Sequence, residues 1–317
     1  MSKPLVNEFS WSPSRDRLFQ SCQRAYYFCY YGSWGGWDAS APERTRLIYM
    51  LKNLQTLALW GGSIVHDVIK TYLSRARSDQ MPFSVGELQE AARQLLRRGW
   101  VESAKGAWQS NPKRAVHLFE HYYGDGTNRL PAEQTEALKQ RVFEALESFC
   151  NSETVAELLA LPYANWKSID VLNSFQPEGV DGEPLKVWSA IDLAYVDCEG
   201  MLHIVDWKTG AEHREELVRQ LQCYALYAMQ EWRTPLERLR LEGVFLNDGG
   251  LRKPFHPTPE SLAMARKYIG NSAKAMRARL RDADANTAAE EDFPPTGVEK
   301  DACRTCPYRQ LCSGEAR

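Results

Sequence analysis

The sequence predicts an α/β fold, and three observations carry this prediction. Apolar runs at 185–197 and 202–207 are rich in β-branched and aromatic residues and are separated by the turn residues of 198–200, which predicts a β-hairpin. A third strand is predicted at 239–246, after a helix at about 213–232. Further helices are predicted before and after these strands. We therefore expect a central sheet flanked by helices.

Composition limits the function classes. The chain has 317 residues, 44% of them hydrophobic, and a mean hydropathy of -0.49, which is typical of an ordered globular protein. Its net charge of -2 provides no overall basic field, so any contact with nucleic acid has to come from a local basic patch. No apolar run reaches the ~20 residues that span a bilayer, and no signal-peptide core is seen. We expect a cytoplasmic protein without membrane contact.

Two helices are predicted in the N-terminal part. Ser12 and Pro13 form a favourable helix start, and the helix is expected to continue until Gly32. A second helix is predicted from about 47 to 73. It contains Gly61 and Gly62, which allow close backbone approach, shortly before His66.

The segment 75–165 is predicted to be a helical insertion. Two apolar faces at helical spacing run through it, one near Leu88 and one near Phe149. A helix is also predicted at 259–281, and the acidic, alanine-rich stretch 282–297 is predicted to be a linker.

Two carboxylates and a lysine stand at the ends of the predicted hairpin strands. Side chains alternate along a strand, so Asp206 and Lys208 should point to the same face, with Trp207 opposite. Asp192 ends the apolar run of the first strand. Charged residues on such buried strands need a partner or a metal, and an acid pair with a lysine suits metal-assisted phosphodiester cleavage. Alone, this pattern is also compatible with a surface hairpin.

Three further side chains are candidates for the same site. Gln220 and Tyr224 are four residues apart on a predicted helix, so both can reach one target, although Tyr224 could equally be a core residue. His66 can complete a carboxylate metal site, although a single histidine on a helix is more often structural.

Cysteine spacing predicts a second metal centre. The chain has eight cysteines, and Cys303, Cys306 and Cys312 in the tail have the spacing of an iron–sulfur or zinc site. A tetrahedral set needs a fourth ligand, for which Cys22 on the first helix is the best candidate. The other four cysteines are predicted to be ordinary buried thiols: Cys29, Cys150, Cys198 and Cys223.

The order of these elements resembles the PD-(D/E)XK nuclease superfamily. Within it, the chain is similar to the RecB-like and AddB-like branch with a four-cysteine iron–sulfur cluster, which includes CRISPR-adaptation exonucleases. The resemblance extends from about residue 10 to 315, outside the insertion. The matching positions follow the family order: Cys22, His66, Asp192, Asp206 with Lys208, Gln220 with Tyr224, and Cys303, Cys306 and Cys312. Two positions depart from it, since Leu193 stands where many relatives have arginine and Ser189 where glycine is common.

This resemblance implies the rest of the architecture. It implies a single nuclease domain over 1–317 with a restriction-endonuclease-like mixed sheet, and an iron–sulfur region formed by both termini, at 10–32 and 293–317. Mg²⁺ or Mn²⁺ would be bound by His66, Asp192 and Asp206, with the Trp207 carbonyl as a further ligand. Lys208 would act on the attacking water, and Gln220 and Tyr224 would position the lysine region or the DNA strand. The four cysteines would hold a structural 4Fe-4S cluster, with zinc as the alternative.

The sequence thus predicts a metal-dependent DNA nuclease that acts on single-stranded DNA or DNA ends, in repair or antiviral defence. A helicase or another DNA-processing subunit is a possible partner. Two alternatives stay open, namely a nuclease-like DNA-binding subunit of a helicase–nuclease complex and a zinc-stabilised module without catalysis. Two basic helical segments are candidate DNA contacts: Arg266, Lys267, Lys274, Arg277, Arg279 and Arg281, or Arg93, Arg97 and Arg98.

Overall fold

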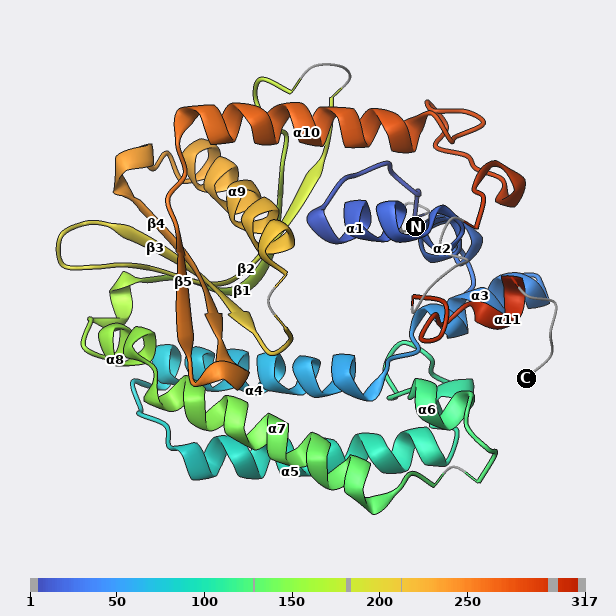
Figure 1. The fold of residues 1–317 in the computed structure, drawn as a ribbon, viewed down its shortest axis with the longest axis horizontal. Helices are drawn as coiled ribbons and strands as arrows, with labels where there is room; N and C mark the ends of the chain where they lie inside the picture. Colours follow the sequence, from blue (N-terminus) through green and yellow to red (C-terminus); the bar gives the residue numbers. More distant parts are fainter. Residues whose placement is uncertain (1–4, 128, 181–183, 212, 296–301, 313–317) are drawn as a thin grey trace.

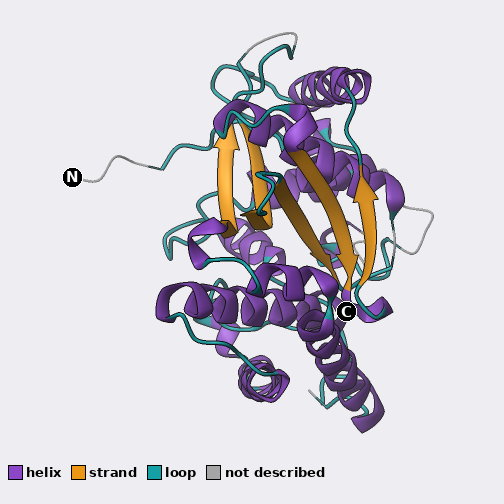
Figure 2. Ribbon diagram, turned by 90° about the vertical axis from the view of Figure 1, so that its left-hand side faces the viewer, coloured by secondary structure: helices purple, strands orange, loops and turns teal. Residues whose placement is uncertain are grey.

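The computed structural model of the protein describes residues 5–127, 129–180, 184–211, 213–295 and 302–312. Its centre is a mixed five-stranded sheet with helices on both faces, which confirms the predicted α/β class (Figures 1 and 2). The strands lie in chain order, and β3 and β4 are parallel while the other neighbours are antiparallel. Their bounds are β1 (Trp166–Phe175), β2 (Val187–Val196), β3 (Leu202–Lys208), β4 (Leu239–Phe245) and β5 (Leu251–Phe255).

The predicted strands at 185–197, 202–207 and 239–246 correspond to β2, β3 and β4, whereas β1 and β5 were not predicted. The hairpin of β2 and β3 opens at one end. Their pairing runs from Val196 opposite Leu202 to Leu193 opposite Val205 and then stops, while β2 continues beside β1. Asp192 and Asp206 are the next residues on the two diverging strands. The sheet therefore places both carboxylates at the point where its strands separate.

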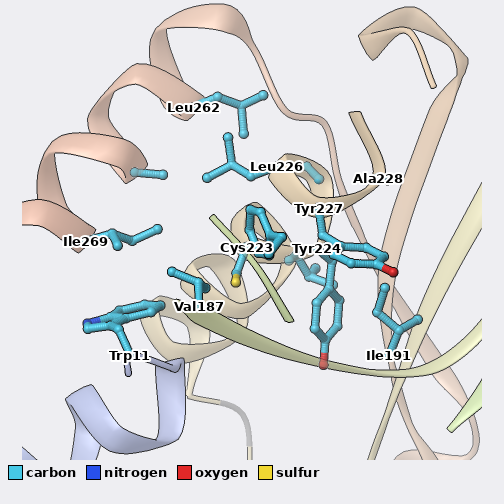
Figure 3. Close-up of a cluster of buried hydrophobic side chains, with 14 of the residues drawn as sticks. Trp11, Val187, Ile191, Cys223, Tyr224, Leu226, Tyr227, Ala228, Leu262 and Ile269 are labelled. Atoms are coloured by element: carbon cyan, nitrogen blue, oxygen red, sulfur yellow. The ribbon is translucent and has the colours of Figure 1, made fainter. Parts of the chain in front are cut away.

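One face of the sheet is covered by α1 (Pro13–Ser21), α9 (Arg214–Glu231) and α10 (Pro259–Arg277), as Figure 1 shows. Val187 and Ile191 of β2 point into this layer, where they meet buried side chains of α9 and α10 (Figure 3). The helix predicted at 213–232 is α9, and the one predicted at 259–281 is α10, which ends four residues earlier, at Arg277.

The other face is covered by α4 (Leu57–Asp79), α5 (Val85–Ala104), α7 (Ala132–Asn151) and α8 (Glu153–Leu159). Trp207 of β3 packs edge-on against Phe149 of α7, with the ring centroids 5.2 Å apart. The helices predicted within 84–161 are present. As predicted, a glycine of α4 allows close approach, because a Cβ on Gly61 would lie 2.6 Å from Cδ1 of Leu138 on α7.

Both predicted N-terminal helices are interrupted. The first ends with α1, because Cys22 is extended (φ -159°, ψ 113°), and the chain continues as α2 (Gln23–Tyr27) and the π-helical turn η1 (Phe28–Gly32). The helix predicted at 47–73 is divided into α3 (Glu43–Lys52) and α4. Between them, Gln55 pairs with the backbone around Leu118, and this pairing requires an extended chain. The short elements are η2 (Ala107–Gln109), α6 (Phe119–Tyr122), η3 (Tyr163–Asn165), η4 (Leu236–Arg238), η5 (Leu246–Asp248), η6 (Glu290–Asp292) and α11 (Arg309–Cys312).

The prediction of a linker at 282–297 is wrong for residues 282–295, because this segment packs on the N-terminal segment. Residues 296–297 lie outside the described chain. Phe293 is fully buried, stacked on Tyr26 with a centroid separation of 6.1 Å, and Arg24 donates a hydrogen bond to its carbonyl. The tail packs on the same N-terminal segment, since Tyr308 lies 5.3 Å from Phe28 between ring centroids. Of the predicted iron–sulfur region, residues 296–301 and 313–317 also lie outside the described chain.

The four thiols predicted to be buried differ in their exposure to solvent. Cys223 is buried in the core beside α10, and Cys29 and Cys150 are half-buried. Cys198 is exposed, because it lies in the turn between β2 and β3, so this part of the prediction is wrong. No helix in the described ranges has the length and apolar character needed to cross a membrane.

Candidate active site

Asp206 and Lys208 end β3 on the face covered by α9. The Asp206 side chain is buried and forms an ion pair with the Lys208 ammonium group at 2.5 Å, so the two residues share a face as the strand alternation predicts. Trp207 points to the opposite layer. Across the sheet Asp206 lies opposite Gly243 of β4, where α9 packs closely, because a Cβ on Gly243 would be 2.7 Å from Leu217.

Gln220 of α9 joins the acid and the lysine. Its amide oxygen accepts a hydrogen bond from Lys208 Nζ at 2.8 Å, and its amide nitrogen donates to Asp206 Oδ1 at 2.7 Å and to the Tyr224 hydroxyl at 2.5 Å. The Tyr224 hydroxyl lies within hydrogen-bond reach of both the Ala190 carbonyl and Asp206 Oδ1, and its single proton can be donated to one of them at a time. The i, i+4 pair on α9 thus reaches one target, as the spacing predicts.

Asp192 connects this network to α4. Its Oδ2 accepts a hydrogen bond from the Trp207 backbone N–H at 2.8 Å, which closes the gap between the diverging strands β2 and β3. Its Oδ1 lies 3.5 Å from Nδ1 of His66, one-third of whose side chain is exposed. Side chains from β2, β3, α4 and α9 therefore converge where β2 and β3 diverge.

Burial and like charge shape the electrostatics of these groups. Burial, together with the neighbouring Asp192, raises the pKa of Asp206, and the Lys208 ammonium group opposes this rise. Burial and the charge of Asp206 hold the pKa of Tyr224 well above its ordinary value, so its hydroxyl stays protonated. Burial would lower the pKa of His66, but the Asp192 carboxylate outweighs it and raises that pKa to about 9.

A comparison with protein families shows the superfamily of the chain. The model of the PD-(D/E)XK nuclease superfamily matches residues 10–313, which is nearly the whole chain. The protein belongs to this superfamily. Its members are nucleases that typically use Mg²⁺ or Mn²⁺ and act on DNA. A comparison with curated proteins found no match.

The donor set of this superfamily member suits a hard divalent cation, because carboxylate oxygens are the preferred ligands of Mg²⁺ and an imidazole suits Mn²⁺. Burial and the neighbouring Asp192 carboxylate raise the pKa of Asp206, and a cation bound between the two carboxylates would offset this repulsion. Within the described ranges, no three or more His, Cys, Asp or Glu side chains are already arranged to hold a metal ion. At this site the Oδ2 atom of Asp206 forms an ion pair with the Lys208 ammonium group.

Two nearby residues were not predicted. Asp170 of β1 stands between Ile169 and Val171, whose partners flank Asp192, and so lies across from that carboxylate. Its φ of 44° is in the left-handed region. Lys70, one helical turn after His66 on α4, forms an ion pair with Asp170 at 2.7 Å. The i, i+4 spacing from His66 could have indicated that Lys70 lies near the site. Asp170 could not be found in this way, because β1 was not recognisable as a strand.

The four predicted cluster cysteines lie where the N-terminal segment meets the tail. Cys22 and Cys306 pack against one hydrophobic cluster, which contains Phe28 and Tyr308. Burial is the main reason that the pKa of Cys306 is raised to about 11, and Cys312, Cys22 and Cys303 contribute to this rise, so all three thiols lie near Cys306. The described residues include no ready-made metal site of three or more ligands here either.

Four residues of the predicted basic segments make structural contacts. Arg266 and Arg277 of α10 donate to backbone carbonyls, and Arg281 forms ion pairs with Glu291 and Asp292. On the insertion, Arg93 forms an ion pair with Glu90 of the same helix. A cleft of about 760 Å³ instead adjoins the candidate site, and its walls carry two arginines that were not predicted, Arg17 of α1 and Arg219 of α9.

Proposed function

We propose that this protein is a Mg²⁺- or Mn²⁺-dependent deoxyribonuclease that hydrolyses phosphodiester bonds of single-stranded DNA or DNA ends. The observation that carries the proposal is the hydrogen-bonded chain Lys208–Gln220–Asp206 beside Asp192, where β2 and β3 diverge, in a chain that matches the superfamily model over residues 10–313. Burying a carboxylate costs desolvation free energy, which is unusual for a hairpin that only covers a surface. A buried acid, a lysine and an amide in contact suit charge stabilisation at a phosphate.

Each residue has a role in this proposal. Asp192, Asp206 and His66 would hold the cation, with the Trp207 carbonyl as a further ligand, and the bound cation would supply charge neutralisation and an acidified water. Lys208 orients the attacking water and stabilises the negative charge that develops on the phosphate. Gln220 holds the lysine through its amide oxygen. Tyr224, which stays protonated, holds Asp206 and Gln220 in place.

The cysteines are proposed to hold a structural 4Fe-4S cluster, with zinc as the alternative. The proximity of Cys22 to the tail supports this proposal. A cluster there would close a loop over almost the whole chain, and the entropy removed from the unfolded state grows with loop length. Service in DNA repair or antiviral defence, with a helicase or other DNA-processing subunit as partner, is the physiological setting that we propose.

The decisive experiment compares cleavage by the wild type with cleavage by Lys208→Ala and Asp206→Ala. We expect Mn²⁺-dependent cleavage of labelled DNA to disappear in both variants while their circular dichroism spectra are unchanged. Lys139→Ala and Asp248→Ala are matched controls, because both residues lie outside the site, and they should cleave as the wild type does. Full activity in either site variant would overturn the mechanism.

A second experiment addresses substrate and partner. End-labelled linear and circular DNA, each single- and double-stranded, are incubated with the isolated protein and Mn²⁺. Degradation of linear single strands with sparing of circles supports action at ends. Cleavage that appears only after addition of a helicase would instead favour a dependent subunit of a helicase–nuclease complex.

A further inference from the structure

The open face of the β1–β2 hairpin carries apolar side chains beside the candidate site. Along β2, Val187 and Ile191 point into the core, as Figure 3 shows, so Trp188 and Ala190 face the other way. Opposite residues of antiparallel strands share a face, which places Leu172 beside Ala190. These side chains form a strip that leads away from the carboxylate Asp192.

This strip is exposed where a sheet would normally be covered. Leu172 is 63% exposed, Ala190 is exposed, and Trp188 is half-buried. None of the three belongs to the hydrophobic clusters formed by the described residues. Contiguous exposed apolar side chains of this kind often mark a contact surface.

The indole of Trp188 is nevertheless held in a fixed orientation. Its Nε1 donates to Ser10 Oγ at 3.2 Å, and the Lys186 ammonium group lies 4.7 Å from its ring centroid. The backbone is fixed too, since Trp188 N donates to the Trp11 carbonyl at 2.8 Å. A rigid aromatic ring with little entropy left to lose is suited to stacking.

The strip and the candidate site share one cleft. Leu172, Trp188 and Ala190 line the cleft of about 760 Å³ together with Lys208 and Gln220. The cleft wall also carries Arg17 and Arg219. Each is paired with a surface glutamate at 3.1 or 3.6 Å, and such exposed pairs are weak enough to exchange for a phosphate.

We infer that this strip is a nucleotide subsite, on which an unpaired base adjacent to the scissile phosphate stacks over Ala190 and Leu172 and against Trp188. The backbone phosphates of the same strand lie toward Arg17 and Arg219. A base in a duplex cannot present its face in this way, so the subsite selects single-stranded DNA or frayed ends. The inference rests on the proposed nuclease function, and it deepens that function by naming the residues that select the substrate.

The test uses short oligonucleotides that carry 2-aminopurine at successive positions, bound in Ca²⁺ so that cleavage does not interfere. The wild type should quench the fluorescence at one or two adjacent positions. Trp188→Leu should lose this local quenching and bind roughly tenfold more weakly, as expected for the loss of one base–aromatic stack. Leu172→Ser should also weaken binding. Leu251→Ser, which removes a similarly exposed leucine from β5 at the far edge of the sheet, should bind as the wild type does.

An abasic nucleotide separates base contacts from phosphate contacts. Placed at the quenched position, it should weaken wild-type binding about tenfold and leave Trp188→Leu binding unchanged. If the wild type cleaves oligonucleotides in Mn²⁺ but is indifferent to abasic sites at every position, the subsite is refuted and the nuclease function stands. If it neither binds nor cleaves them, both are refuted. If Trp188→Leu fails to fold, Leu172→Ser and the abasic series on the wild type decide.

Discussion

The Lys208 ammonium group donates a hydrogen bond at 2.8 Å to the amide oxygen of Gln220, whose amide nitrogen holds Asp206 at 2.7 Å. One side chain of α9 thus fixes both an acid and a base that come from β3. Because the amide offers both an acceptor and a donor, neither a carboxylate nor an alkyl side chain can reproduce both contacts.

Substitution of Gln220 should therefore reduce turnover without removing the charged groups. We expect Gln220→Ala to lower kcat about 10- to 100-fold, since small displacements of a catalytic group have effects of this size. The KM for DNA should change little. Gln230→Ala, at the far end of the same helix, is the control. Steady-state cleavage of a labelled oligonucleotide measures both constants, and an unchanged kcat in Gln220→Ala would contradict the positioning role.

Metal binding should be visible as thermal stabilisation. A cation that binds the folded state alone stabilises it by about 2.7 kcal/mol at a hundredfold excess over its Kd. We expect Mn²⁺ to raise the Tm of the wild type by several degrees and EDTA to reverse this rise. Asp206→Asn should show no such rise, whereas Asp248→Asn, an exposed change in η5, should respond as the wild type does. An equal shift in Asp206→Asn would place the cation elsewhere.

The candidate site was more predictable than the strands around it, and the reason is local. Strand alternation and helical spacing fix how Asp206, Lys208, Gln220 and Tyr224 point, and neither depends on distant parts of the chain. The edge strands carry no such pattern. In β5, Lys253 and Pro254 occupy central positions. Lysine and proline are typical of edge strands, but they make the segment hard to recognise as a strand from its sequence.

Long-range packing accounts for the remaining errors. Phe293 follows an acidic stretch that resembles a linker, yet it is buried against Tyr26, and nothing in its neighbourhood indicates this contact. The extended Cys22 and the pairing of Gln55 with Leu118 likewise interrupt helices whose local sequences favour continuation. In β1, the exposed Leu172 removes the alternation that would have revealed the strand.

The cysteine region can be tested by colour and stability together. Cys303→Ser should abolish the visible absorption of an iron–sulfur cluster and lower the Tm, since metal binding contributes directly to folding free energy. Cys198→Ser, in the exposed turn between β2 and β3, is the matched control and should keep both properties. Colourless wild-type protein with one zinc ion per chain would favour the zinc alternative. A soluble, stable and colourless Cys303→Ser protein would show that the cluster does not stabilise the fold.

His117 should make the protein sensitive to mild acid. Burial beneath Trp108, whose ring stacks on it at 3.8 Å, lowers its pKa from 6.5 to about 4. Between these values the unfolded state binds more protons, so stability is complete above pH 6.5 and falls as the pH drops toward 4. The shift corresponds to about 3 kcal/mol. Urea unfolding at several pH values should show a shallower loss for His117→Phe, and the same slope as the wild type would contradict the assignment.

The close packing of α9 on β4 gives the last prediction. A Cβ on Gly243 would lie 2.7 and 2.9 Å from the two Cδ atoms of Leu217, so Gly243→Ala requires a shift of the buried Leu217 side chain or of the start of α9. We expect a destabilisation of about 1–3 kcal/mol, as is usual for overpacking. Gly86→Ala is the matched control. It meets no heavy atom within 4 Å in helix α5 and should stabilise the protein by about 0.5–1 kcal/mol. Because α9 carries Gln220, Gly243→Ala should also lower kcat at temperatures where it remains folded. Unfolding and cleavage measured side by side test this link, and a destabilised variant with wild-type kcat would show that the site tolerates movement of the helix.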